Sequence, residues 1–211
     1  MTTLVSATPT PQELFNMRAF RVLLDCLARP GKIGQLPAAP LHGGLPSLPG
    51  GGLASPVAVA TLLSLIDQRV GFAHASNGKW LESDHPLTRW IAIRSNAQPA
   101  APEEADFALL HDPVSIVLLH ALKSGTLLHP EQSCTVFLSV PEIIDGGATI
   151  RLSGPGIATW VTVGLSGVAP AELEMLAARR EPFPLGIDIV LIDSRGRCLG
   201  LPRTTQMTLL H

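Results

Sequence analysis

A segment near the carboxyl terminus, residues 181–205, constrains the fold more strongly than any other part of the sequence. Its core, Ile187–Ile192, is β-branched and apolar, which is typical of a buried strand. A polar turn follows at Ser194–Arg197, and Cys198–Leu201 is apolar enough to return as the partner strand. The sequence therefore predicts an antiparallel hairpin in this segment.

The residues after this hairpin form a candidate anion-binding group. Arg203, Thr204 and Thr205 place a guanidinium beside two hydroxyls, which together can bind an anion. Gly154 and Gly156 lie in a loop after another predicted strand, where glycine lets backbone amides approach an anion. This loop lacks the spacing of a dinucleotide-binding motif and the lysine of a P-loop, so a tight turn is its simpler interpretation.

Three residues of the hairpin have competing interpretations. Asp188 lies in an apolar strand, where an unpaired carboxylate is costly, so we interpret it as a structural partner of Arg203 or of a backbone amide. Gly186, directly before the strand, is assigned a structural role as well. Cys198 has arginines nearby in sequence, but a buried strand cysteine is favoured over a nucleophile. No catalytic residue is assigned.

A helix is expected to begin near the amino terminus. Thr10 can cap it, Pro11 suits its first position and Glu13 completes a capping box. We expect it to end at Pro30-Gly31. The face predicted to pack on the core carries five apolar residues at helical spacing: Leu14, Met17, Phe20, Leu24 and Leu27.

Further helices and strands alternate along the chain. Helices are predicted at 57–66, 84–96, 112–125 and 171–180, the third with Val114, Val117, Leu118 and Ala121 at helical spacing. Strands are predicted at 70–75, 105–110, 134–140 and 148–153, and the last two are expected to pair. The segment 34–52 is rich in glycine and proline and reads as a surface connection. The pattern predicts one α/β domain over residues 1–211, with a mixed β-sheet covered by helices.

Composition limits the classes of function. Of the 211 residues, 46% are hydrophobic and 15% are charged, which favours a subunit that buries part of its surface. A net charge of −2 gives no basic footprint for nucleic acid. The amino terminus does not resemble a secretory signal, and the longest apolar run, 56–66, is too short for a membrane span, so a cytoplasmic location is expected. The three cysteines, Cys26, Cys134 and Cys198, are expected to be reduced and buried.

Cofactor chemistry has little support in the sequence. The seven histidines show no helical pair and no nearby cysteine at metal-ligand spacing, so no metal site is predicted. Pyridoxal phosphate requires a lysine for its imine, and Lys32, Lys79 and Lys123 have no distinctive neighbours. We therefore predict no cofactor.

Several short motifs, spread from Phe20 to Thr205, resemble those of the PhnH family, the H subunit of the bacterial carbon-phosphorus lyase core complex. They are Phe183–Asp188 with Pro202–Thr205, Phe20-Arg21 with Leu24 and Pro30-Gly31, Gly125-Thr126 with Pro130-Glu131, and Arg151–Gly154 with Gly156-Ile157. The resemblance implies a fold similar to pyridoxal-phosphate-dependent transferases without the cofactor, and a homodimer. It also implies association with the G, I and J subunits.

The same resemblance implies a role in phosphonate catabolism. With the G, I and L subunits, this family supports transfer of methylphosphonate to the ribose of ATP with loss of adenine, which gives alpha-D-ribose 1-methylphosphonate 5-triphosphate; the later radical cleavage belongs to the J subunit. No catalytic residue carries over, and we predict a complex-forming subunit that is not catalytic alone. The alternative is a free-standing phosphate- or phosphonate-binding enzyme that uses Arg203, Thr204 and Thr205. In a third interpretation, Arg203 only anchors the chain.

Overall fold

The computed structural model describes residues 8–41, 43–179 and 183–210, and it has the predicted α/β architecture with a mixed sheet. Its helices are α1 Pro11–Ala28, α2 Pro56–Leu63, α3 Pro86–Ser95 and α4 Pro170–Ala178, with 3₁₀ helices η1 Pro49–Gly51, η2 Pro113–Ala121 and η3 Pro130–Gln132. Its strands are β1 Ile33–Gln35, β2 Gly71–Ser76, β3 Lys79–Trp80, β4 Gln98–Pro99, β5 Phe107–Leu110, β6 Thr135–Val140, β7 Glu142–Ser153, β8 Val161–Ser166, β9 Asp188–Asp193, β10 Arg197–Leu201 and β11 Gln206–Leu209.

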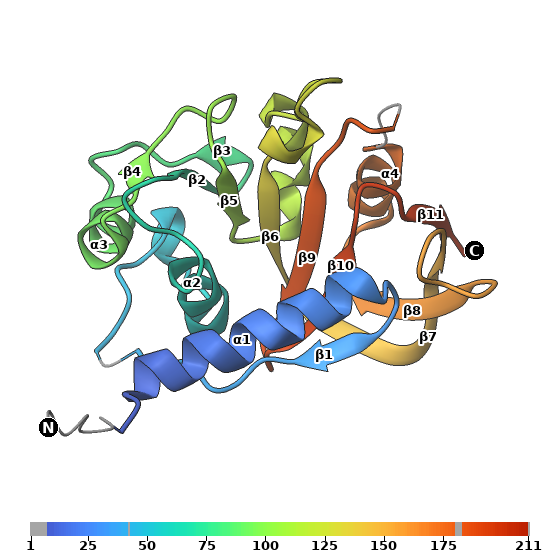
Figure 1. Ribbon diagram of the computed structural model, residues 1–211, viewed down its shortest axis with the longest axis horizontal. Helices are drawn as coiled ribbons and strands as arrows, with labels where there is room; N and C mark the ends of the chain where they lie inside the picture. The colour runs from blue at the N-terminus through green and yellow to red at the C-terminus, as the bar shows by residue number, and fades with distance from the viewer. Residues whose placement is uncertain (1–7, 42, 180–182, 211) are drawn as a thin grey trace, which may run out of the picture.

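Within these described residues, eight strands form the main sheet, in the order β1-β10-β9-β6-β5-β2-β3 with β4 beside β2 (Figure 1). The four central strands β2, β5, β6 and β9 are parallel, whereas β10, β1 and β3 join antiparallel to their neighbours. The hairpin predicted from residues 187–201 is confirmed as β9 and β10. Three more strands form a second antiparallel sheet in the order β11-β7-β8.

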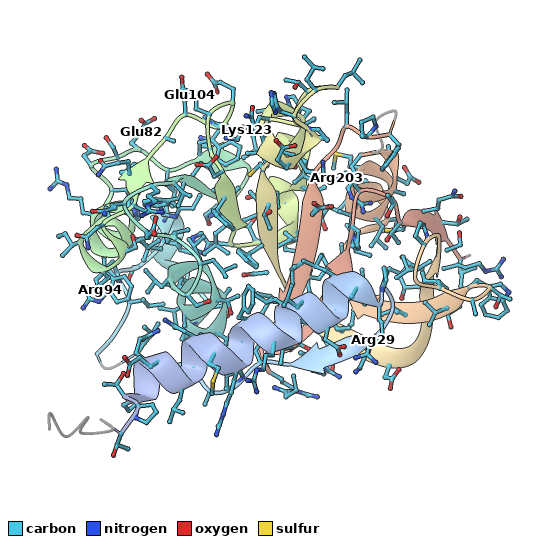
Figure 2. The ribbon with its side chains drawn as sticks, in the orientation of Figure 1. Arg29, Glu82, Arg94, Glu104, Lys123 and Arg203 are labelled. Atoms are coloured by element: carbon cyan, nitrogen blue, oxygen red, sulfur yellow. The ribbon has the colours of Figure 1, made fainter. Side chains whose placement is uncertain are left out.

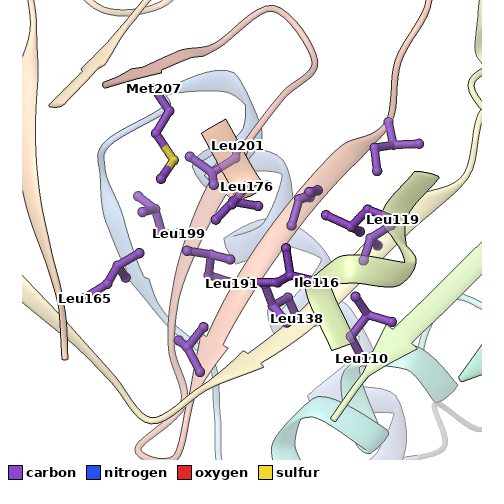
Figure 3. Packing of buried hydrophobic residues seen from close by; sticks show 14 of the residues in the cluster. Leu110, Ile116, Leu119, Leu138, Leu165, Leu176, Leu191, Leu199, Leu201 and Met207 are labelled. Atoms are coloured by element: carbon purple, nitrogen blue, oxygen red, sulfur yellow. The ribbon is translucent and has the colours of Figure 1, made fainter. Parts of the chain in front are cut away.

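The register of the central strands divides the interior into two cores. Leu109, Phe137 and Val190 are register partners that face α1, α2 and α3. The next residue of each strand points to the opposite face, as alternation along a strand requires. There it packs against η2, α4 and the second sheet (Figure 3). Both faces of the parallel strands are therefore buried, which explains their continuous apolar sequences.

Helix α1 begins as the sequence predicted. The Thr10 hydroxyl accepts a hydrogen bond from the Glu13 amide at 3.2 Å, and the Glu13 carboxylate accepts one from the Thr10 amide at 2.8 Å. These reciprocal bonds satisfy amides that have no partner inside the helix. The capping box is confirmed.

The predicted core-facing side of α1 was wrong. The helix buries Phe15, Ala19, Leu23 and Cys26, whereas Met17, Phe20 and Leu24 are 46%, 49% and 52% exposed. Close approach to the sheet explains the choice of face. A Cβ added at Gly200 in β10 would lie 2.4 Å from the Cys26 carbonyl oxygen, so the backbone of α1 near Cys26 lies directly against this strand. Three of the five residues in the predicted apolar stripe thus face outward, whereas Leu14 and Leu27 are partly buried and Leu27 packs against the core.

Two more predictions required correction. Strands β6 and β7 do not pair, because β5 and β9 already occupy both edges of β6, and β7 pairs with β8 and β11. The segment after Asp112 is the 3₁₀ helix η2 rather than an α-helix. With three residues per turn, Ile116 and Leu119 share its buried side, while Val114 and Val117 are exposed.

Other elements follow the sequence more closely. The predicted helices around residues 57–66 and 84–96 are α2 and α3, and the predicted strands at 70–75 and 105–110 are β2 and β5. Arg180, at the end of the fourth predicted helix, and Glu181 and Pro182, at the start of the hairpin segment, lie outside the described residues. All three cysteines are buried, as expected. In the part of the chain that the structure describes, every helix is too short or too polar to cross a membrane.

Candidate functional site

Arg203, which follows the β9-β10 hairpin, lies at the amino ends of the parallel strands β6 and β9 (Figure 2). Its guanidinium Nη2 donates to Asp188 Oδ2 at 2.6 Å and its Nε donates to Asp188 Oδ1 at 3.3 Å. The Arg203 backbone amide donates to Asp188 Oδ1 as well, at 2.8 Å. The carboxylate in the apolar strand is therefore paired through side chain and backbone together.

The remaining Arg203 donors join two further segments. Nη1 donates to the carbonyl oxygens of Pro130 at 2.7 Å and Pro184 at 3.3 Å, and Nη2 donates to the Ser133 hydroxyl at 2.5 Å. An arginine has five side-chain N–H donors, and each has a protein acceptor here. Arg203 thus ties η3 and the segment before β9 to the connection between β10 and β11.

The glycines of the predicted anion group make close backbone contacts. A Cβ at Gly154 would lie 2.9 Å from the Thr204 carbonyl oxygen, so this loop does meet the Thr204-Thr205 segment. A Cβ at Gly156 would lie 2.9 Å from the carbonyl oxygen of Ala28, at the end of α1. Gly186 similarly allows close approach of the Arg203 side chain, with a Cβ distance of 3.1 Å. The structure brings Gly154 together with the two threonines, and Gly156 with α1.

A cavity of about 410 Å³ lies at the opposite, carboxyl ends of β5, β6 and β9. In open α/β sheets, ligands bind at this edge. Its lining comes from four segments: Leu53–Pro56 at the start of α2, His111–Pro113 after β5, Ser139–Pro141 at the end of β6, and Ile192–Ser194 at the end of β9. None of these described lining residues is a lysine or an arginine.

A chain of side chains fixes the tautomer of His111. The Thr88 hydroxyl donates to the Glu82 carbonyl at 2.8 Å, so Thr88 must accept from His74 Nε2, 2.6 Å away. In a neutral imidazole, His74 Nδ1 is then an acceptor, and it receives the Nε2 proton of His111 at 3.0 Å. The remaining nitrogen, His111 Nδ1, therefore presents a lone pair.

Burial keeps both rings neutral near pH 7. Burial, with smaller contributions from His111 and His85, lowers the pKa of His74 to about 3. Burial also lowers the pKa of His111 to about 4, although the nearby Asp112 carboxylate opposes this shift. The hydrogen bonds among Thr88, His74 and His111 require neutral rings, because each neutral ring has one donor and one acceptor nitrogen.

Two polar atoms in this lining have no hydrogen-bond partner among the described residues: His111 Nδ1 and Ser139 Oγ. Ser139 is only 8% exposed. Leu110 and Leu138 are register partners, so the residues that follow them, His111 and Ser139, occupy adjacent positions on neighbouring strands. Buried polar groups normally have partners, so this pair marks a site that can accept a ligand.

The carboxylates that line the cavity are already satisfied. Asp112 accepts from the Ser76 hydroxyl, the Asn77 amide, and the amide and hydroxyl of Ser115. Each Asp112 oxygen therefore has two donors, and the aspartate serves as the cap of η2.

Both carboxylate oxygens of Asp193 also have hydrogen-bond donors within the protein. It accepts from the amides of Ile143, Arg195 and Arg197, and Arg197 Nε adds an ion pair at 2.7 Å. Its charge is thus balanced within the protein.

Sequence reasoning missed the histidine chain. The seven histidines were searched for helical pairs, whereas His74 lies on β2 and His111 directly follows the adjacent parallel strand β5. The sequence did contain one usable signal, because His111-Asp112 follows directly after a predicted strand, where parallel strands present ligand-binding groups. The described residues hold no group of three or more histidine, cysteine or acidic side chains arranged for a metal.

Comparison with known proteins gives matches along nearly the whole chain. Residues 12–208 match the model of the family described as bacterial phosphonate metabolism protein (PhnH). A Rhizobium meliloti (strain 1021) protein, named alpha-D-ribose 1-methylphosphonate 5-triphosphate synthase subunit PhnH, is 33% identical over 192 residues, which cover 89% of this chain and 88% of the relative. A Stutzerimonas stutzeri protein, named putative C-P lyase subunit protein HtxG, is 29% identical over 191 residues, which cover 90% of this chain and 85% of that protein.

Proposed function

Because the chain belongs to the PhnH family of bacterial phosphonate metabolism proteins, we propose that it is a subunit of the assembly that forms alpha-D-ribose 1-methylphosphonate 5-triphosphate from ATP and methylphosphonate. The family predicted from the sequence motifs is confirmed. The observation that carries the proposal is the extent of the likeness, since a relative named as a subunit of that synthase aligns with 89% of the chain.

The proposed partners are the G, I and J subunits of the carbon-phosphorus lyase core complex, in the cytoplasm. The relative named as a putative C-P lyase subunit supports membership of such an assembly. A supporting role rather than independent catalysis is consistent with the predicted anion group, in which every Arg203 side-chain donor already has a protein acceptor. Chemistry in the assembly is therefore assigned to the other subunits.

The fold proposed for this subunit is that of pyridoxal-phosphate-dependent transferases without the cofactor. The mixed sheet with a parallel centre and helices on both faces supports this relationship. Two of the three lysines are committed to ion pairs, Lys32 with Asp25 and Lys123 with Asp106, each at 2.5 Å. An amine engaged in such a pair is not free to form an imine with a cofactor.

A homodimer is also part of the proposal, and the exposed stripe of α1, formed by Met17, Phe20 and Leu24, is its proposed contact. These residues are spaced three and four positions apart, so they lie on one side of the helix. Phe20 and Leu24 also belong to the motifs shared with the family. Burial of such a stripe against the same stripe of a second copy would form a two-fold contact.

The assembly is tested by co-expression of the chain with its G, I and J counterparts. We expect all four proteins to co-elute from a sizing column after affinity capture of one partner. If the chain elutes by itself while its counterparts assemble, the proposed role is wrong.

The dimer contact needs a separate test on the isolated chain. Leu24→Asp should convert a dimer into a monomer in sedimentation experiments, because it places a charge in the buried stripe. Ile93→Asp is the matched control, since Ile93 is an exposed apolar residue of α3, outside the stripe. A monomeric unmodified chain at micromolar concentration, or an equal effect of both variants, would contradict the proposed contact.

Anion binding by Arg203, Thr204 and Thr205 with the Gly154 and Gly156 loop stays a prediction. An anion would have to compete with the protein acceptors that now occupy Arg203. Calorimetric titration of the isolated chain with ATP and an alkylphosphonate tests it, with Arg203→Ala as the control. Heat that persists in the variant, or no heat with the unmodified chain, would exclude this group as the site.

A further inference from the structure

Directly beneath the lining of the cavity at the carboxyl ends of β5, β6 and β9 lie two hydrogen-bonding atoms without a partner among the described residues, and the described lining carries no positive charge. His111 Nδ1 accepts a hydrogen bond, and Ser139 Oγ can both accept and donate. Neither a lysine nor an arginine is found among its described lining residues, and two aspartates line it. A phosphate or phosphonate would meet a neutral imidazole lone pair and the Asp112 carboxylate, whose hydrogen-bond donors are all uncharged. The charges therefore disfavour an anion and favour a neutral ligand with hydrogen-bond donors.

The two polar groups are spaced for adjacent hydroxyls. They follow register partners on neighbouring parallel strands, whose backbones lie about 4.8 Å apart. One hydroxyl of a vicinal diol can donate to His111 Nδ1 while the next pairs with Ser139 Oγ. Because both atoms are buried beneath the cavity surface, binding is expected to include a small side-chain rotation.

The rest of the lining suits an apolar body. Leu53, Pro56, Val140 and Pro141 contribute aliphatic surface around the polar pair. A volume of about 410 Å³ falls within the range of small-molecule sites. Ligand sites commonly combine such apolar walls with a few polar groups that fix orientation.

We propose that this cavity binds a neutral nucleoside, whose vicinal hydroxyls pair with His111 Nδ1 and Ser139 Oγ and whose base packs along the apolar wall. His74, Thr88 and the Glu82 carbonyl hold the His111 ring in the tautomer that leaves Nδ1 as a hydrogen-bond acceptor. This inference concerns the isolated chain. Its test is independent of the assembly experiment, because a nucleoside can bind whether or not the chain joins its proposed partners.

The test is a titration of the full chain, labelled with ¹⁵N in its histidines, followed by NMR of the imidazole nitrogens. The probes are adenosine, 2′,3′-dideoxyadenosine and inorganic phosphate. Adenosine should shift the Nδ1 signal of His111 in a saturable manner, because Nδ1 gains a hydrogen bond. Dideoxyadenosine should bind at least several-fold more weakly, and phosphate should leave the signal unchanged.

Variants separate ligand binding from structure. Ser139→Ala should weaken adenosine binding about 2- to 10-fold, the effect of one ordinary hydrogen bond. It should not lower the melting temperature, because it removes a buried hydroxyl that has no protein partner among the described residues. His129→Gln is the control; His129 is exposed and hydrogen-bonded to Glu131, outside the cavity lining.

Several results would overturn the proposal. Equal binding of adenosine and its dideoxy form would show that the diol is not recognised. A shift caused by phosphate and not by adenosine would identify an anion site. No shift with any probe would show that none of these ligands reaches His111 Nδ1, and a Ser139→Ala variant that melts lower yet binds adenosine normally would assign Ser139 a structural role.

Discussion

Lowering the pH from 7 to 5 should destabilise this protein through His74 and His111. Burial lowers the pKa of these rings to about 3 and about 4, below the ordinary value of 6.5 expected in the unfolded chain. Between pH 6.5 and 4, the unfolded chain therefore binds more protons than the folded chain. Stability is full above pH 6.5 and is lost as the pH falls through this window.

The size of the effect follows from the unfolded pKa. A pH of 5 is 1.5 units below 6.5, the ordinary pKa of each imidazole in the unfolded chain. One unit corresponds to about 1.4 kcal/mol. Each histidine thus costs about 2 kcal/mol of unfolding free energy at pH 5, and the two together cost about 4 kcal/mol. Carboxyl groups contribute little here. Their ordinary pKa values in the unfolded chain, about 4, lie below the range from pH 7 to 5, and the Thr10 backbone amide lowers the pKa of Glu13 further, from 4.5.

Urea unfolding monitored by circular dichroism at pH 7, 6 and 5 measures the loss. His111→Gln removes one titrating ring and should reduce the pH-dependent decrease by about half, whatever its effect on stability at pH 7. His129→Gln, at an exposed site, should retain nearly the full decrease. A stability that does not change between pH 7 and 5, or an equal decrease in His111→Gln, would refute the argument that buried neutral histidines determine this dependence.

Three substitutions test other parts of the fold. Arg203→Lys should lower the unfolding free energy by about 2–3 kcal/mol, because lysine cannot reproduce the planar fork, while co-elution with partner subunits is retained; chemical denaturation and a sizing column report the two effects. Gly200→Ala should cost about 1–3 kcal/mol, because its Cβ would lie 2.4 Å from the Cys26 carbonyl, whereas Gly44→Ala, with no atom within 4 Å, should be near neutral in the same assay. Thr10→Ala should cost about 1 kcal/mol in thermal unfolding through loss of the α1 cap.

Local signals in the sequence predicted much of the secondary structure. The Thr10–Glu13 capping box, the Ser55-Pro56 start of α2 and the apolar run of β9 each involve contacts within a few residues of the chain. These contacts do not depend on what packs against them. The hairpin of β9 and β10 could be predicted from the sequence for the same reason, because a short turn joins two strands that are adjacent in the sheet.

The errors arose where distant segments decide the structure. Helix α1 carries two possible packing faces, and the buried one lies against Gly200, which is far away in sequence and leaves room for the helix backbone at Cys26. Strand β7 could pair with β6 on local criteria, but both edges of β6 are occupied by parallel strands that come from elsewhere in the chain. The hydrophobic periodicity of a segment does not indicate which face of α1 packs on the sheet or which strand pairs with β7.

The candidate site divides in the same manner. Arg203 and Asp188 could be associated from the sequence because a buried carboxylate needs a partner, and the structure pairs them at 2.6 Å. The pair formed by His111 and Ser139 depends on the register of β5 against β6. Strand order and register could not be read from the sequence, so this pair was invisible to it.

Release of adenine in a reconstituted reaction is the decisive measurement of the proposed role of this chain. The purified G, I and L counterparts are incubated with ATP and methylphosphonate, with and without this chain, and adenine is quantified by chromatography. The account predicts that adenine release requires the chain and is restored by its addition. Release at the same rate without the chain would contradict its role as a subunit of this synthase.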